Sequence, residues 1–372
     1  MLRRTLVLII YLSLFGVGLK PAQTQTTEAL RKISQSLGQG VNISLLEQHW
    51  QSQEQLLKTN IRPMLESIAE AGFETVRLPV AFDYFMREGS VAFDYFMREG
   101  SVQLNEQILQ KLHETYMNCR RLNLKLVIVY HYGKLNNQNK ETETERIIKI
   151  WKQVIHYMRE FSNEKLFLEL YNEPTTDMDI WKSTATTLVR ELRKEDPDRI
   201  FIIGGANYNG INELLTMGKL SSDDGKILYT FHFYEPYVFT HQGAEWTKEK
   251  TYMTGLPYPF KKRKMPELLG AAPDSEVIKE FERFPRESNY DYLFMRIKKI
   301  KTEADKQNLP LICTETGVIN LASVKAKSAY LRDITSIMKR FDIPVMLWDY
   351  NDKFGILKGE KVMKQLKNWL KD

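Results

Sequence analysis

The sequence contains too little cysteine for a disulfide-bonded scaffold, since only Cys119 and Cys313 occur in 372 residues. This excludes the class of small secreted folds that are held together by several disulfides. Cys119 falls in a helix-like segment and Cys313 in a strand-like one, where a buried free thiol is expected. Because side chains alternate along a strand, Cys313 is predicted to lie on the same face as Glu315, in the barrel interior described below.

The sequence also lacks metal-binding motifs. Its six histidines show no spacing typical of zinc enzymes, such as His-Glu-x-x-His. We therefore predict that the protein uses neither a catalytic metal nor another cofactor.

Long hydrophobic runs are scarce. The longest, residues 5–19, spans 15 residues, whereas a bilayer requires roughly 20. Arg3 and Arg4 precede this run and a polar segment follows it, which is the pattern of a secretory signal. We predict a signal peptide at residues 1–24, a secreted or periplasmic protein, and no stable membrane span. A retained membrane anchor is the alternative.

The excess of positive charge is small. Removing residues 1–24 takes away Arg3, Arg4 and Lys20 and no acid, so the formal net charge falls from +6 to +3. The one basic cluster, residues 261–264, is typical of a solvated loop. The balance predicts an uncharged substrate and no nucleic-acid partner, with a monomer as the default state.

The chain does contain a regular alternation of short apolar runs and helical segments. Strands alternating with helices predict a parallel sheet, and eight of them predict a closed (β/α)₈ TIM barrel. We expect one catalytic domain over residues 25–372, with a last helix at 359–370. The eight predicted strands are 38–45, 74–80, 124–131, 166–171, 199–205, 226–233, 309–315 and 343–349.

Two glutamates follow strand-like runs directly before a helix-breaking residue. Glu173 precedes Pro174, and Glu315 lies two residues before Gly317. In a parallel barrel, the C-terminal ends of the strands carry the chemistry. The two residues are therefore candidates for a catalytic pair of carboxylates.

A long loop is predicted between the sixth and seventh strands. Residues 234–260 are rich in tyrosine, phenylalanine, tryptophan and proline. Trp246 and Tyr237 either stack against sugar rings or pack the loop onto the barrel, and the sequence leaves both interpretations open.

A perfect tandem repeat follows the second predicted strand. The sequence VAFDYFMREGS occupies residues 80–90 and again residues 91–101. Only two copies are present, which excludes a solenoid. We expect one copy to occupy the ordinary loop position and the other to bulge from it.

Six short motifs at predicted strand ends resemble glycoside hydrolase family 5, the cellulase-type retaining β-glycosidases. The resemblance covers about residues 37–372. The motifs are RLP at 77–79, the histidine at 131, NEP at 172–174, HFY at 232–234, TETG at 314–317 and LWD at 347–349.

The resemblance implies a role for each catalytic residue. Glu173 would be the acid/base and Glu315 the nucleophile of a double displacement. Asn172 would bind the sugar 2-hydroxyl. Arg77 and Tyr234 would hold Glu315 ionised, and His232 would orient Glu173.

The same resemblance places the substrate-binding residues. His131 and Trp348 would contact the sugar beside the cleavage point. Tyr132 stands where many family members have histidine or asparagine, so the contact made there is expected to differ.

The sequence therefore predicts a retaining, endo-acting β-glycoside hydrolase, with endo-1,4-β-glucanase as the leading activity. β-Mannanase, xyloglucanase and β-1,3-glucanase remain alternatives within the family. A non-catalytic carbohydrate-binding barrel is the alternative from another class, although it would be expected to have lost part of the catalytic set. An aldolase-type barrel would need a strand-end lysine that the sequence lacks.

Overall fold

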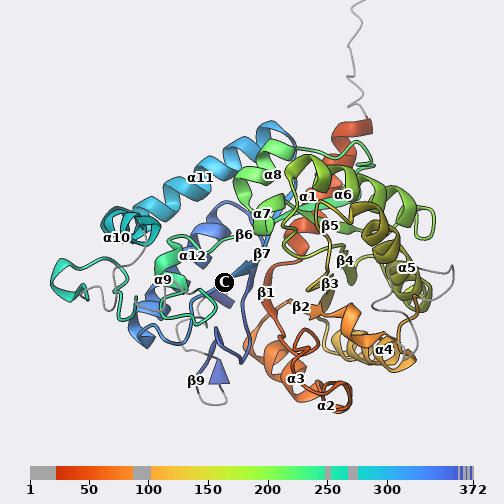
Figure 1. Cartoon of the computed structure of the whole chain (residues 1–372), viewed down its shortest axis with the longest axis horizontal. Coiled ribbons are helices and arrows are strands. Elements are labelled where there is room, and N and C mark those ends of the chain that lie inside the picture. The colour runs from red at the N-terminus through yellow and green to blue at the C-terminus, as the bar shows by residue number, and fades with distance from the viewer. Residues whose placement is uncertain are drawn as a thin grey trace, which may run out of the picture.

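Eight parallel strands close into a barrel in which β1 lies beside β8 (Figure 1). The computed structural model describes residues 22–86, 102–247, 253–266, 275–358, 361–362, 366 and 369–370. The strands are β1 Gln39–Asn42, β2 Thr75–Val80, β3 Lys125–Tyr130, β4 Leu166–Glu169, β5 Phe201–Gly204, β6 Ile227–His232, β7 Leu311–Thr316 and β8 Val345–Leu347. The TIM-barrel prediction and all eight predicted strands are confirmed.

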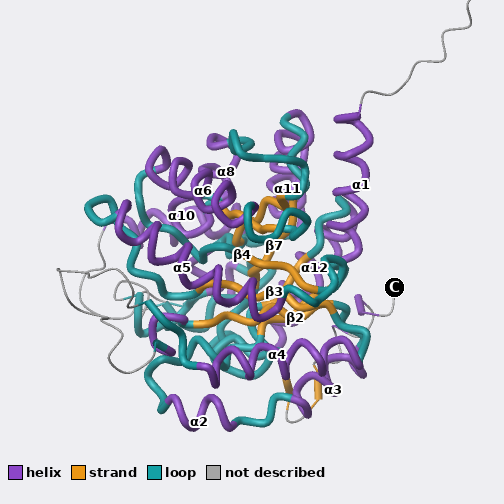
Figure 2. Tube along the Cα trace, turned by 90° about the vertical axis from the view of Figure 1, so that its right-hand side faces the viewer, coloured by secondary structure: helices purple, strands orange, loops and turns teal. Residues whose placement is uncertain are grey.

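Helices surround the barrel on its outside, as Figure 2 shows in a second view. The longer ones are α1 Ala22–Ser36, α3 Arg62–Ala71, α4 Glu106–Arg121, α5 Lys140–Met158, α6 Met178–Arg193, α10 Ser275–Glu287, α11 Tyr290–Lys306 and α12 Val324–Arg340. The shorter ones are α2 Gln53–Lys58, α7 Ala206–Asn209, α8 Ile211–Met217 and α9 Tyr237–Thr240.

Local sequence signals set several of these helix ends. The side chains of Asn105 and Ser323 accept hydrogen bonds from backbone N–H groups in the first turns of α4 and α12. Gly72 ends α3 with a φ of 100°, a conformation that glycine adopts without steric cost. These caps fix where each helix returns the chain to the next strand.

The barrel interior is apolar at the end where the strands begin. Side chains from β3 to β8 form a separate cluster there, and Leu30 and Leu37 pack against it. Leu30 comes from α1, and Ser34 of the same helix donates a hydrogen bond to the backbone carbonyl of Leu311 at 3.2 Å. The helix α1 therefore closes the end of the barrel where the strands begin, opposite the face that carries chemistry.

The structure corrects the prediction that Cys313 and Glu315 lie on the same face. The ladder between β6 and β7 shifts register, so that Phe231 pairs with Cys313 but His232 pairs with Glu315. This irregularity adds a residue to β7 and breaks the simple alternation of faces. Cys313 consequently packs in the outer core between barrel and helices, whereas Glu315 points inward. The prediction that the two share a face was wrong.

The predicted helix at 359–370 is also wrong at its start. Lys361–Val362 form a short strand, β10, which pairs antiparallel with β9, Leu357–Lys358. The intervening sequence contains Gly359, which favours a tight turn and weakens a helix.

Several predictions fall outside the described residues. Residues 1–21 of the predicted leader, the last four residues of the first repeat copy (87–90) and the whole second copy (91–101) lie there. The described part begins with α1 at Ala22, inside the predicted leader. None of the described helices is long and apolar enough to cross a membrane.

Residues 81–86 of the first repeat copy follow β2 directly and include a short 3₁₀ helix, Phe82–Phe85. Phe82 and Phe85 are buried, and Asp83 pairs with Arg146. Met86 forms an isolated bridge with Leu104, and residues 87–101 between them are outside the described part.

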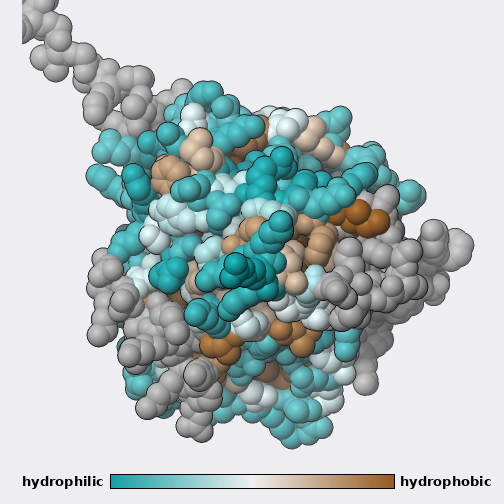
Figure 3. Space-filling view, turned by 90° about the vertical axis from the view of Figure 1, so that its left-hand side faces the viewer, coloured by the Kyte–Doolittle hydropathy of each residue, from teal (hydrophilic) through white to brown (hydrophobic). Residues whose placement is uncertain are grey.

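The outer surface is mostly polar where the structure describes it. On the side where α10 and α12 lie, hydrophilic residues predominate and hydrophobic ones form small separate areas (Figure 3). The basic cluster at 261–264 is exposed, as predicted for a solvated loop.

Candidate active site

Arg77 lies at the centre of a polar layer inside the barrel, between the apolar cluster and the C-terminal ends of the strands. Its side chain is fully buried, and every guanidinium N–H donor has an acceptor. Two donors go to Glu169 at 2.7 and 2.8 Å, and one goes to Glu315 at 2.6 Å. The remaining two go to the side-chain oxygens of Asn42 and Asn172, each at 2.8 Å. One cation thus fixes four side chains from different strands and loops.

Glu315 is held by three neighbours. Besides Arg77, the Tyr234 hydroxyl donates to its Oε2 at 3.0 Å, and His232 Nδ1 lies 3.5 Å from the same oxygen. Burial raises the pKa of Glu315, while the charges of His232 and Arg77 oppose that rise. Burial also keeps the pKa of Tyr234 well above its ordinary value, so this hydroxyl stays a donor.

Glu173 stands in the loop beyond β4 with a φ of 47°, a left-handed conformation that is uncommon for glutamate. His232 Nδ1 lies 2.7 Å from its Oε1. One carboxylate oxygen of Glu173, one of Glu315 and a ring nitrogen of His232 all lie within 4.8 Å of one another. Retaining glycosidases place their two carboxyl groups about 5–5.5 Å apart, whereas inverting enzymes need roughly 6.5–9.5 Å. The short separation matches the retaining arrangement.

The same three side chains have the donor types that could ligate a cation, and they belong to the predicted catalytic set. A double displacement by two carboxyl groups uses their protons and charges directly and requires no metal.

Glu169 was not singled out from the sequence. It lies in β4, is fully buried, and binds Arg77 through both carboxylate oxygens. The signal was present, because a lone acid in an apolar strand must be paired when it is buried. Glu169 orients the arginine that in turn contacts Glu315.

His131 and Trp348 meet at the C-terminal face of the barrel. Their rings are parallel within 7°, with centroids 5.8 Å apart. Burial and the charge of Arg77 hold the pKa of His131 well below its ordinary value, so the imidazole is neutral. Trp348 is partly exposed, so part of its indole surface is accessible.

Tyr132 belongs to an exposed aromatic group on the β1 side of this face. Its side chain is 47% exposed and makes edge contacts with His49 and Trp50. It also faces the carboxyl group of Glu47. Burial raises the pKa of Glu47 to about 7, and Ser44 donates a hydrogen bond to it.

Trp246 and Tyr237 lie on the other side of the face. Tyr237 stacks on His241 with ring centroids 3.9 Å apart, and Trp246 contacts the rings of His241 and Phe354. Trp246 nevertheless remains 51% exposed. Both residues pack the loop and still present surface, so neither of the two open interpretations excludes the other.

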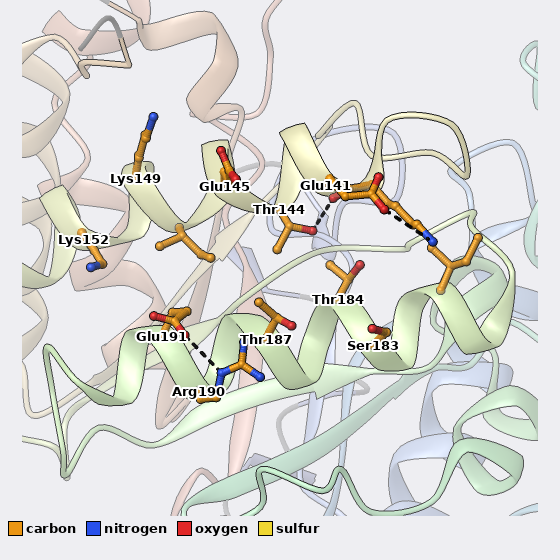
Figure 4. Close-up of a pocket in the computed structure, with 13 residues that line it drawn as sticks. Glu141, Thr144, Glu145, Lys149, Lys152, Ser183, Thr184, Thr187, Arg190 and Glu191 are labelled. Atoms are coloured by element: carbon orange, nitrogen blue, oxygen red, sulfur yellow. Dashed lines mark hydrogen bonds and ion pairs between the residues drawn. The ribbon is translucent and has the colours of Figure 1, made fainter. Parts of the chain in front are cut away.

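A hollow lies on the flank of the molecule, between α5 and α6 (Figure 4). It measures about 600 Å³ and is lined by charged and hydroxyl side chains, including Glu145, Lys149 and Thr187. No aromatic ring is among its lining residues. It therefore lacks the flat apolar surface on which sugars stack, and it lies away from the strand ends.

Comparison with known proteins agrees with this geometry. The family model for cellulase, glycosyl hydrolase family 5, matches residues 34–354. The chain belongs to glycosyl hydrolase family 5. Family 5 membership makes it a glycosidase, as predicted from the six motifs.

Curated family 5 relatives cover most of the chain. Endoglucanase C of Acetivibrio thermocellus is 30% identical over 298 residues, spanning 77% of this chain and 82% of that protein. Endoglucanase C307 of a Clostridium species has the same identity and coverage. Cellodextrinase A of Ruminococcus flavefaciens is 27% identical over 293 residues, or 75% of each chain.

Solved structures share the fold. A hyperthermophilic endo-β-1,4-glucanase in complex with substrate superposes with a TM-score of 0.75 at 21% identity, covering 92% of this chain and 98% of that chain. Cel5A of Thermotoga maritima in complex with mannotriose gives a TM-score of 0.72 at 20% identity, covering 91% of this chain and 99% of that chain.

Proposed function

We propose that the protein is an endo-1,4-β-glucanase that cleaves β-glucan with retention of configuration. The observation that supports this most directly is the pair Glu173 and Glu315 at the C-terminal face of the barrel. A carboxylate oxygen of one lies within 4.8 Å of a carboxylate oxygen of the other. The curated relatives named above are endoglucanases and a cellodextrinase, which favours β-1,4-glucan over the other family 5 polymers.

In the first step, Glu315 attacks the anomeric carbon while Glu173 gives its proton to the leaving glycosidic oxygen. The bond to the leaving sugar breaks, and an ester forms between Glu315 and the retained sugar. Arg77 and Tyr234 hold the two oxygens of Glu315, so the attacking carboxylate is fixed before substrate arrives.

In the second step, Glu173 acts as a base. It removes a proton from water, which attacks the anomeric carbon and releases Glu315. His232 Nδ1 lies 2.7 Å from Glu173 Oε1 and 3.5 Å from Glu315 Oε2, so the ring is placed to contact both carboxylates.

Asn172 is placed to bind the sugar 2-hydroxyl. Its Oδ1 accepts from Arg77, so its amide nitrogen is left as the donor toward the substrate. Such a contact stabilises the transition state when it strengthens as the sugar ring distorts.

The aromatic residues divide the remaining face into two sides. We assign His131 and Trp348 to the sugar beside the cleavage point, and Tyr132 to the next contact on the same side. Tyr237 and Trp246 are assigned to the opposite side, where the leaving part of the polymer lies.

We further propose that the protein is exported through residues 1–24 and acts as a monomer on polysaccharide. The apolar run at residues 5–19 supports export. N-terminal sequencing of exported protein tests it, since an intact Met1 would contradict cleavage.

The deciding experiment measures reducing-sugar release from carboxymethyl-cellulose, mixed-linkage glucan, xyloglucan, mannan and xylan. Wild type, Glu173→Gln and Glu315→Gln are compared, with loss of viscosity followed in parallel. We expect cleavage of β-1,4-glucan with a rapid fall in viscosity, the mark of internal attack, and loss of most activity in both variants.

Two outcomes would overturn the proposal. Preference for mannan or xylan would assign another family 5 activity. Binding of glucan without release of reducing ends would favour the non-catalytic barrel.

A further inference from the structure

Asn209 touches the catalytic set although no sequence motif pointed to it. It is the last residue of α7, and its side chain is fully buried. Its Nδ2 lies 3.1 Å from His232 Nε2. The other ring nitrogen, Nδ1, lies 2.7 Å from Glu173 Oε1. A single imidazole therefore lies between the Asn209 amide and the acid/base carboxylate.

An unusual turn presents Asn209 to the ring. Asn207, Tyr208 and Asn209 have φ values of 51°, 61° and 54°, three left-handed residues in succession. Asparagine tolerates this conformation, whereas tyrosine rarely adopts it. The Tyr208 N–H donates to the carbonyl of Pro174 at 3.3 Å, which ties the turn to the residue after Glu173.

Gly204 makes room for the amide. A β-carbon at this position would lie 2.1 Å from Asn209 Oδ1, far inside contact distance. Among the residues that the structure describes, the His232 ring is the one side chain that the Asn209 amide binds, and Asn209 Oδ1 is buried without a hydrogen-bond partner. A buried acceptor that is left unpaired normally lowers stability.

The contact determines where His232 carries its proton. The amide N–H of Asn209 donates, so Nε2 must accept. A neutral imidazole has one N–H, which then sits on Nδ1 and donates to Glu173.

Three charged or acidic groups and one neutral titratable group from other elements also face His232. They are Glu173 from the loop after β4, Glu315 from β7, Arg77 from β2 and the neutral imidazole of His131, directly after β3. Burial lowers the pKa of His232, but the charge of Glu315 and the contact with Glu173 outweigh it, and the net shift is upward. A donor at Nε2 opposes this pull toward the imidazolium.

We propose that Asn209 is a positioning residue that keeps the proton of neutral His232 on Nδ1, facing Glu173. This inference rests on the proposed function. A neutral donor lets Glu173 hold a proton for the first step, whereas an imidazolium at the same distance would favour the ionised carboxylate and weaken the acid.

Two substitutions at Asn209 test the proposal through the pH dependence of kcat/KM. Asn209→Asp supplies a carboxylate that accepts from Nε2–H and stabilises the imidazolium. We expect the basic limb of the profile to move down by about one pH unit or more, because Glu173 then loses its proton more easily. Asn209→Leu keeps the size and removes the donor, and we expect kcat/KM to fall about tenfold.

Asn207→Asp is the matched control. It adds the same charge to the same turn, but Asn207 is exposed and contacts Glu213 instead of His232. We expect its basic limb to coincide with that of wild type. An equal shift in both aspartate variants, or a loss of activity in Asn209→Asp that is uniform with pH, would overturn the inference and leave Asn209 a structural role.

A measurement on wild type avoids any failure of the variants to fold. Long-range ¹⁵N–¹H spectra of the histidine rings, recorded above the pH at which His232 titrates, identify its tautomer directly. We expect the Nδ1–H form, and the Nε2–H form would overturn the inference. Because the spectrum does not depend on turnover, it remains informative even if wild type cleaves no glucan and the proposed function fails.

Discussion

Arg77 and Glu169 form a two-pronged ion pair inside the barrel, with N–O distances of 2.7 and 2.8 Å and neither side chain exposed to solvent. The pair comes from β2 and β4, and Arg77 continues from it to Glu315. Glu169 therefore acts on the reaction through Arg77 without reaching the substrate.

Glu169→Gln should disrupt both stability and activity. Glutamine removes one of the two carboxylates that pair with the buried Arg77, and breaking a buried ion pair costs about 3 kcal/mol or more. Displacement of Arg77 should lower kcat/KM by about a hundredfold. Chemical denaturation and steady-state kinetics measure the two effects, and Glu66→Gln in the exposed pair with Arg62 is the control. A stable, fully active Glu169→Gln variant would contradict the role given to Arg77.

Rescue by azide should distinguish the nucleophile from the acid/base residue. With an aryl β-cellobioside, Glu315→Ala should be rescued to give the α-glycosyl azide, because azide replaces the missing nucleophile. Glu173→Ala should instead give the β-glycosyl azide, because azide attacks the glycosyl-enzyme that forms on Glu315. Proton NMR of the products distinguishes the anomers, and the opposite assignment would exchange the two roles.

Glu47 should make the protein less stable as pH rises. Burial raises its pKa to about 7 from the ordinary 4.5, so the folded state holds the proton more tightly than the unfolded state between these values. Stability is then lost as pH rises from 4.5 to 7. Glu47→Gln should remove this loss and exceed wild type at pH 8 by about 1–3 kcal/mol. Denaturation at pH 5 and pH 8 tests the difference, and equal slopes for wild type and variant would refute it.

One copy of the repeat should be dispensable. Deleting residues 91–101 leaves the buried Phe82 and Phe85 and the Met86–Leu104 bridge in place, while it shortens the connection between the bridged residues. The unfolding free energy should stay equal or rise by about 1 kcal/mol, and kcat should not change. A melting temperature well below that of wild type would show that the second copy contributes contacts of its own.

Trp246→Ala should weaken binding of long substrates more than it slows catalysis. The exposed part of the ring offers a stacking surface at a distance from the two glutamates. We expect KM for long cello-oligosaccharides to rise about three- to tenfold with kcat nearly constant, from the loss of one aromatic contact. If KM is unchanged and the melting temperature falls, Trp246 serves only to pack against His241 and Phe354.

The sequence was sufficient for the barrel because strand and helix periodicity are local properties. It also placed Glu173 and Glu315 at strand ends, and Arg77, His232 and Tyr234 lie where the motifs put them, in contact with one or both glutamates.

What the sequence could not reveal depends on tertiary context. The register shift that puts Cys313 and Glu315 on different faces of the sheet arises where β6 and β7 pair. No residue type in β7 predicts it from the sequence. Asn209 lies in a turn of left-handed residues, its side chain packs against Gly204, and its partner His232 follows 23 positions later in the chain. At the start of the predicted helix at 359–370, pairing between β9 and β10 likewise replaces the helical turn that periodicity suggested.

The position of α1 has a practical consequence. This helix closes the barrel at the strand starts, so the N-terminal side of the folded domain faces away from the two glutamates. An enzyme attached to a bead or a scaffold through a tether placed before Ala22 would present its catalytic face outward to an insoluble polymer. A tether built into the loops after β6 or β8 would instead stand between the enzyme and its substrate.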